Sequence, residues 1–219
     1  MFKFKSIAIL SFFLLSSCAY QGDASDPFNR KFSYFSMVNG DDIRAACKPG
    51  VERYRLIYNG VYDEHLRIYE IKRGPKDYHS VRTTVSTPAN VTDAVTSADI
   101  LAPWRGKQSL TQLDDATFEK LVKSFEASGM FEPAPKGLRL ASDGFYWIAV
   151  ACKNEKVAFQ AWPYPSERFS QISFAKLLTA IDGNEIAFRP AEAKRFAIRS
   201  GRSSEQEFTL HIGDNGLIR

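Results

Sequence analysis

Apolar and polar residues alternate with a period of two in three neighbouring stretches, at residues 53–58, 65–71 and 78–85. In the first stretch, Tyr54, Leu56 and Tyr58 fall on one face, and two arginines fall on the other. Turn-forming pairs, Asn59-Gly60 and Gly74-Pro75, separate the stretches. Such a pattern is typical of half-buried strands joined by short connections. We therefore expect a three-stranded antiparallel meander, followed by a long ordered connection at residues 87–110.

Two later segments have the spacing of amphipathic helices. Asp114 suits an N-cap and Gly129 suits the residue after a helix end. Between them, Phe118, Leu121, Val122 and Phe125 recur on one helical face. A second helix, capped by Ser166, should carry a similar apolar stripe up to Gly183. A shorter helix is expected at residues 42–47.

Residues 145–152 are apolar on both faces of the predicted strand, a pattern that indicates a strand buried at the middle of a sheet. The stretch 157–162 should pair with it across the polar turn 153–156, and a last strand is expected at 208–212. The predicted order is three strands, helix, two strands, helix, strand. This order favours an α+β fold: a single domain with a mainly antiparallel sheet of about six strands and two main helices packed on one face.

The first 18 residues have the features of a targeting segment. Lys3 and Lys5 precede an apolar run from Ile7 to Leu15, which is shorter than the ~20 residues that a membrane-spanning helix needs. The run ends in Leu15-Ser16-Ser17-Cys18. This tetrapeptide resembles the lipobox of bacterial lipoproteins, in which a branched apolar residue and two small residues precede the cysteine that becomes lipidated. A conventional secretory signal cut near the same place is the alternative.

The resemblance implies removal of residues 1–17 and acylation of Cys18, with palmitate or a related fatty acid. Residues 18–35 would then form a lipidated N-terminus and short tether, and residues 36–219 would form the globular domain. In Gram-negative lipoproteins, an aspartate after the cysteine favours the inner membrane, and here position 19 is alanine. The resemblance therefore implies a lipid anchor in the cell outer membrane, on its periplasmic face.

Composition adds little evidence for a charged partner. Without Lys3 and Lys5 the chain carries 27 basic and 25 acidic residues, so the formal charge of +4 falls to about +2. Apolar residues make up 44% of the chain, which suits a folded globular domain. We expect membrane association to depend on the lipid anchor alone, and we do not expect nucleic acid as a partner.

Two cysteines remain once Cys18 carries lipid. Cys47 and Cys152 would then lie outside the cytoplasm, where disulfide bonds form and persist. We expect them to pair, with the amino-terminal segment crossing the strand face that holds Cys152, Ile148 and Val150. Two separate buried thiols are the alternative.

Known catalytic and metal-binding patterns are missing from the sequence. The three histidines, His65, His79 and His211, do not have the spacing of a zinc site, and no nucleophile elbow, P-loop or dinucleotide fingerprint occurs. The run Asp63-Glu64-His65 places an acid beside an imidazole, but such residues are common in exposed turns. We therefore predict no catalytic residue, no metal site and no cofactor, and we expect that the protein is not an enzyme.

Two sets of residues are candidates for a binding surface. Tyr146, Trp162 and Tyr164 gather around one predicted hairpin, and tyrosine and tryptophan suit protein interfaces and glycan stacking. Arg195, Arg199 and Arg202 belong to a basic stretch that could meet anionic headgroups. In each case the alternative is structural, with the aromatic residues in the core and the arginines in a solvated loop.

These observations predict a non-catalytic envelope lipoprotein that binds a partner protein or an envelope polymer at the membrane surface. An envelope hydrolase and a structural or assembly component of the envelope are the alternatives. A histidine buried beside an acid would favour the hydrolase.

Overall fold

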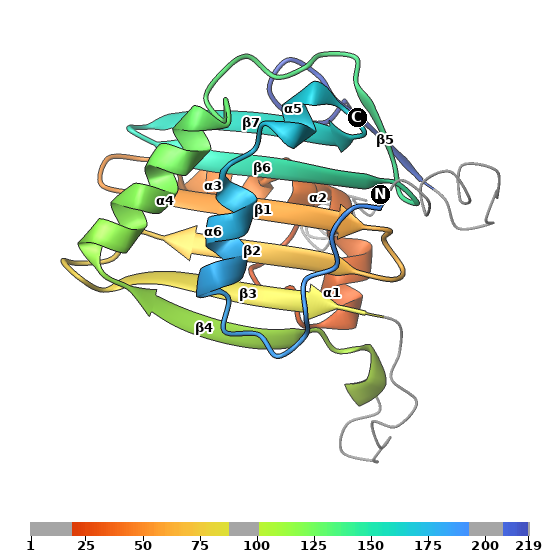
Figure 1. Cartoon of the computed structure of the whole chain (residues 1–219), viewed down its shortest axis with the longest axis horizontal. Coiled ribbons are helices and arrows are strands. Elements are labelled where there is room, and N and C mark those ends of the chain that lie inside the picture. Colours follow the sequence, from red (N-terminus) through yellow and green to blue (C-terminus); the bar gives the residue numbers. More distant parts are fainter. Residues whose placement is uncertain (1–18, 88–100, 193–207, 219) are drawn as a thin grey trace, which may run out of the picture.

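Six antiparallel strands form one sheet in the order β4-β3-β2-β1-β6-β7 (Figure 1). The computed structural model describes residues 19–87, 101–192 and 208–218. The strands are β1 (Arg53–Gly60), β2 (Leu66–Lys72), β3 (His79–Ser86), β4 (Lys107–Leu113), β5 (Arg139–Ala141), β6 (Phe145–Lys153), β7 (Lys156–Tyr164) and β8 (Thr209–His211). The helices are α1 (Pro27–Phe32), α2 (Tyr34–Asn39), α3 (Asp41–Ala46), η2 (Ala102–Trp104), α4 (Asp115–Ala127), α5 (Glu167–Ser170) and α6 (Phe174–Ile181). The predicted α+β class and antiparallel sheet are confirmed.

The β1–β2–β3 meander and the β6–β7 hairpin form as predicted, and β1 also pairs with β6, which joins them into one sheet. Ile57 of β1 lies opposite Ile68 of β2 on one side and opposite Ile148 of β6 on the other. The β6–β7 hairpin turns at Asn154 and Glu155, which both have positive φ, as a tight hairpin turn requires. One prediction for the sheet is wrong, because residues 107–110, which were expected in the long connection, belong to the edge strand β4.

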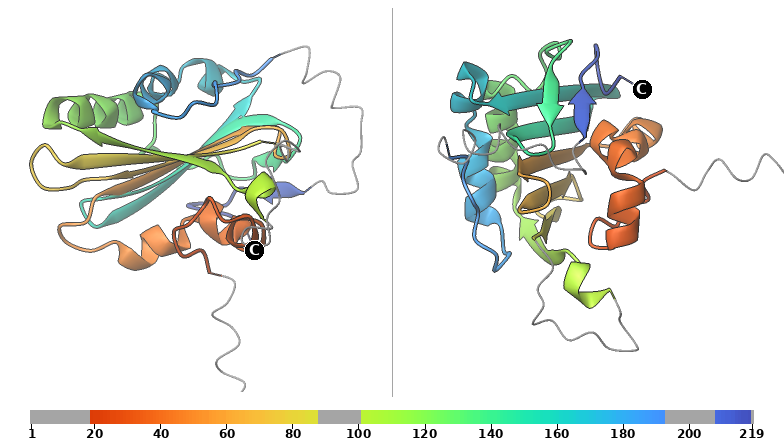
Figure 2. Two further views of the ribbon diagram at one scale, coloured as in Figure 1. Left: turned by 90° about the horizontal axis from the view of Figure 1, so that it is seen from below. Right: turned by 90° about the vertical axis from the view of Figure 1, so that its right-hand side faces the viewer.

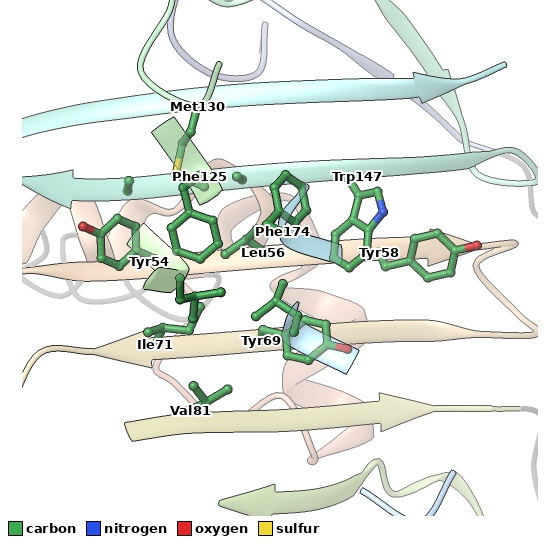
Figure 3. Packing of buried hydrophobic residues seen from close by; sticks show 14 of the residues in the cluster. Tyr54, Leu56, Tyr58, Tyr69, Ile71, Val81, Phe125, Met130, Trp147 and Phe174 are labelled. Atoms are coloured by element: carbon green, nitrogen blue, oxygen red, sulfur yellow. The ribbon is translucent and has the colours of Figure 1, made fainter. Parts of the chain in front are cut away.

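Helices α4 and α6 cover one face of the sheet, where the larger apolar core lies (Figures 2 and 3). Asp114 caps α4 by accepting a hydrogen bond from the Thr117 amide at 2.7 Å, and Gly129 has a φ of 76° just after the helix. Phe125 and Trp147 each pack against Phe174 of α6. The second predicted helix is divided in two, because Ser166 caps the short α5 and α6 begins separately.

The opposite face of the sheet is covered by α1, α2 and α3 together with β5 and β8 (Figure 2). Residues 18–35 were predicted as a tether, but their described part, 19–35, is folded. Tyr20 and Ala24 are buried, and Asp26 caps α1 by accepting from the Asn29 amide. Gly40, with a φ of 69°, lets the α2–α3 junction approach β6 so closely that a Cβ atom there would lie 2.5 Å from Val150 Cγ1. The N-terminal helices are therefore an integral layer of the domain.

Candidate functional site

The aromatic residues predicted to form a binding surface lie mainly in the core. Tyr146 and Trp162 are each 1% exposed, and they belong to the cores on opposite faces of the sheet. The Trp162 indole donates a hydrogen bond to the Ser128 carbonyl at 3.0 Å. Tyr164 is half-buried against Phe169. These residues cannot form one surface, so this prediction is wrong. Cys18, Arg195, Arg199 and Arg202 lie outside the described residues.

Cys47 and Cys152 form a disulfide bond, as predicted, with Cα atoms 5.6 Å apart. Cys47 follows α3, and Cys152 lies near the end of β6. The bond ties the N-terminal helical layer to the interior strand that it covers. The expected crossing of the Ile148–Val150 face by the amino-terminal segment is also confirmed, since these side chains pack in the same core as Ile43 of α3.

A buried histidine does lie beside an acid. His79, at the start of β3, is 1% exposed, and its Nε2 atom lies 2.6 Å from the Asp115 carboxylate. Its Nδ1 atom accepts a hydrogen bond from the Gly74 amide at 3.2 Å, and its ring packs on Phe118. The His79 hydrogen bond lowers the pKa of Asp115. Both ring nitrogens thus make contacts that join the β2–β3 turn to the start of α4.

His65 is buried without a hydrogen-bond partner. Neither of its ring nitrogens has one among the described residues, and its ring lies between Tyr58 and Phe188. Burial, with a smaller contribution from the charge of Arg67, lowers the pKa of His65 to about 4. The imidazole is therefore neutral near pH 7. The neighbouring Glu64 pairs with Arg189 at 3.5 Å, and His211 is exposed.

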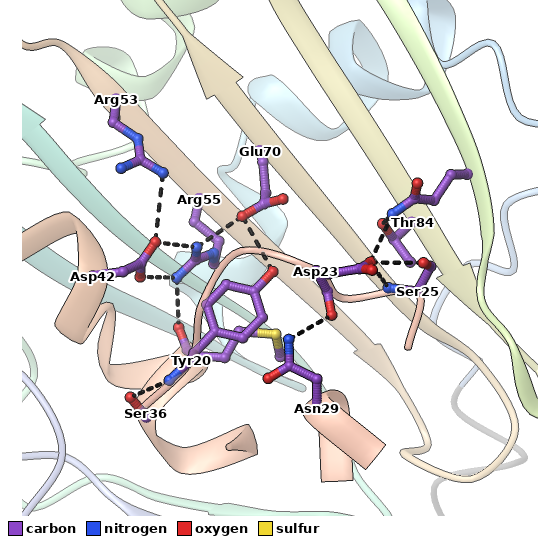
Figure 4. Close-up of polar contacts among 12 residues, drawn as sticks. Tyr20, Asp23, Ser25, Asn29, Ser36, Asp42, Arg53, Arg55, Glu70 and Thr84 are labelled. Carbon is purple, nitrogen blue, oxygen red and sulfur yellow. Dashed lines mark hydrogen bonds and ion pairs between the residues drawn. The ribbon is translucent and has the colours of Figure 1, made fainter. Parts of the chain in front are cut away.

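A buried ionic network holds the N-terminal segment on the sheet (Figure 4). Arg55 of β1 donates hydrogen bonds to Asp42 and Glu70, each at 2.8 Å. The ring of Tyr20 stacks on the Arg55 guanidinium, 4.5 Å from the ring centroid, and its hydroxyl donates to Glu70 at 3.3 Å. Burial alone would raise the pKa of Asp42, but hydrogen bonding to Arg55 and the charges of Arg55 and Arg53 outweigh it, so that pKa is lowered. Tyr20 is thus held on the sheet through its contacts with Arg55 and Glu70.

An exposed row of aromatic side chains lies on the outer side of α1 and α2. Phe28, Phe32 and Phe35 are 56%, 69% and 54% exposed. Their spacing of four and then three residues places them on one helical face. The hydrogen bonds from Ser33 N to Asn29 O and from Met37 N to Ser33 O carry the helical pattern across the junction of the two helices. We call Phe28, Phe32 and Phe35 the aromatic stripe.

The inner side of the same two helices packs against the sheet. Tyr34, Met37 and Val38 are each at most 2% exposed. The sequence-based predictions did not separate the exposed phenylalanines from these buried residues. The helical spacing could have separated the two sets, since positions 28, 32 and 35 fall opposite positions 34, 37 and 38.

A cavity of about 350 Å³ opens beside the aromatic stripe, between α1, η2 and the start of β2. Phe28, Leu66, Leu101 and Trp104 contribute apolar walls, and Lys31 and Asp63 contribute charges. Arg30 stabilises the cavity wall: its guanidinium donates to the carbonyls of Ala24 and Trp104, each at 2.8 Å. Burial lowers the pKa of Arg30. The cavity can hold a ligand with an apolar part and a charged group.

Within residues 19–87, 101–192 and 208–218, no group of three or more potential ligands could hold a metal ion. The helices in these ranges are also too short, or too polar, to cross a membrane. Comparisons with protein-family models, with curated proteins and with solved structures found no match.

Proposed function

We propose that this protein is a bacterial envelope lipoprotein that is acylated at Cys18 and binds a partner at the membrane surface without catalysing a reaction. The observation that carries the proposal is the tetrapeptide Leu15-Ser16-Ser17-Cys18 at the end of an apolar run. The disulfide between Cys47 and Cys152 supports it, because such bonds persist in oxidising compartments. Alanine at position 19 supports the outer membrane as the site of the anchor.

Lipidation is tested by growing cells with a clickable fatty acid and comparing the wild type with Cys18→Ser. The wild-type protein should carry the label and float with membranes, because several acyl chains give stable anchoring. The Cys18→Ser variant should lack the label and either leave the membrane fraction or remain unprocessed. Equal labelling of the two proteins would refute acylation at this residue.

The cavity beside the aromatic stripe is the place where we propose that the partner protein or envelope polymer binds. Affinity capture of the lipidated protein from membranes would identify the partner. Trp104→Ala and Lys31→Glu should reduce its recovery, because they change an apolar wall and the charge at the rim. Leu110→Ala is a matched control, since Leu110 is an exposed apolar residue on β4, away from the cavity. Equal recovery with all three variants would exclude the cavity as the site.

An envelope hydrolase remains the alternative that a specific observation favours, namely the His79–Asp115 pair. Our proposal instead assigns this pair to joining a turn to a helix. His79→Gln should then lower stability and leave the deletion phenotype complemented. Loss of complementation with unchanged abundance and thermal stability would favour the hydrolase.

A further inference from the structure

The fold begins only two residues after the proposed lipid anchor. Tyr20 is 2% exposed and is held at three points: its amide donates to Ser36 Oγ at 3.1 Å, its hydroxyl donates to Glu70, and its ring stacks on Arg55. Two residues of extended chain span at most ~7 Å. An acyl group at position 18 would thus be linked to Tyr20 through no more than this length of chain, and it would bring α2 to the level of the lipid headgroups.

The aromatic stripe lies on the two helices that this short link controls. Phe35 directly precedes Ser36, and Phe28 and Phe32 continue the stripe along α1, with their rings stacked 6.0 Å apart. Rings that are more than half exposed are costly in water, and contiguous exposed apolar groups mark sites of contact. Lys31 directly precedes Phe32 in the sequence and is exposed. Aromatic side chains flanked by a basic residue are typical of helices that lie in a membrane interface.

We propose that the aromatic stripe inserts into the interface of the same bilayer that holds the acylated Cys18, so that the outer side of α1 and α2 rests on the membrane. The proposal depends on the lipidation proposed above. The bilayer is the surface that the stripe contacts, because Tyr20, which is fixed in the fold, follows the proposed anchor Cys18 by only two positions. With the stripe in the headgroup region, the domain has a fixed orientation and the cavity next to Phe28 opens near the membrane surface.

Fluorescence quenching in vesicles tests this orientation. The full lipidated protein is reconstituted in phosphatidylcholine vesicles with or without brominated acyl chains. A Trp104→Phe background removes the half-exposed indole, and Trp147 and Trp162 remain as buried emitters that are common to all variants. Phe32→Trp then places a reporter in the stripe. Flotation of each sample on a density gradient shows first that the protein is anchored.

Tyr78→Trp in the same background is the matched control. Tyr78 is 66% exposed, close to the 69% of Phe32. It lies in the β2–β3 turn, at the opposite end of β3 from the cavity residue Ser86. The eight residues of β3 span roughly 26 Å. A reporter at this position should remain in water when the stripe is in the interface.

The added emission of Phe32→Trp should fall strongly in brominated vesicles and resist aqueous iodide, whereas that of Tyr78→Trp should show the reverse. Anchored protein in which iodide quenches both reporters equally would overturn the membrane contact while leaving lipidation intact. Protection of the Phe32→Trp indole from both quenchers would also overturn it, because a protein partner or a second copy would then cover the stripe. Failure of the wild type to float would overturn lipidation and this inference together.

Discussion

At the scale of single residues, burial distinguishes two arginines that have the same partner. Arg53 and Arg55 both lie on β1 and both contact Asp42. The Arg53 side chain is 22% exposed and its nearest carboxylate oxygen is 3.4 Å away. The Arg55 side chain is fully buried and also pairs with Glu70. Removing a fully buried charge leaves its partners uncompensated, whereas an exposed pair contributes little.

Arg55→Met should therefore lower the free energy of unfolding by about 3–5 kcal/mol, because Asp42 and Glu70 would lose the charge that compensates them. The matched variant Arg53→Met should cost less than about 1 kcal/mol. Chemical denaturation followed by tryptophan fluorescence measures both values. Similar losses for the two variants would contradict the assigned difference in burial.

His65 predicts a dependence of stability on pH. The unfolded chain protonates this residue near pH 6.5, whereas burial keeps it neutral in the folded protein down to about pH 4. This difference in pKa contributes to the free energy of unfolding, and the contribution is fully present above pH 6.5. As the pH falls from 6.5 to 4, up to about 3 kcal/mol of it is lost. His65→Leu should reduce the slope of unfolding free energy against pH in this range. Denaturation curves at several pH values measure the slope, and an unchanged slope would contradict the prediction.

At the scale of elements, the sequence predicted those with strong periodic signals. Helix α4, the β1–β2–β3 meander and the β6–β7 hairpin all have regular apolar spacing or a clear cap. Strand β4 was missed because it is an edge strand with mainly polar side chains, and its pairing with β3 depends on backbone hydrogen bonds. The pattern of β4 alone could not distinguish a strand from a loop.

The pair α1–α2 should tolerate substitution on its outer side and not on its inner side. Phe32 is 69% exposed and Met37 is fully buried. Phe32→Ala in detergent should change the free energy of unfolding by no more than about 0.5 kcal/mol, while Met37→Ala should cost about 2–5 kcal/mol through the cavity that it leaves. Thermal or chemical unfolding of the two variants checks this. A large loss for Phe32→Ala would mean that the stripe packs within the domain.

At the scale of the whole molecule, the sheet is covered on both faces, and this is where sequence reasoning was least complete. Arginines on β1 suggested a wet face opposite Tyr54 and Leu56. In the structure, Arg55 is compensated by carboxylates from α3 and β2, so that a charged residue can lie beneath a helical layer. Such compensation depends on contacts between distant segments, which alternation along one strand does not reveal. The disulfide was predictable because only Cys47 and Cys152 remain once Cys18 is assigned to the lipobox.

The disulfide joins the two parts of the molecule whose contact the strand pattern did not predict. Cys47 belongs to the N-terminal layer and Cys152 to the sheet, with a sequence separation of 105. Closing a loop of this length restricts the unfolded chain, so the double variant Cys47→Ala with Cys152→Ala should lose about 2–5 kcal/mol. Chemical denaturation of the oxidised wild type and the double variant measures the loss. The wild type in a reductant should match the variant closely. If the reduced wild type and the double variant kept the stability of the oxidised protein, the non-covalent contacts of the N-terminal layer would be sufficient to hold it on the sheet.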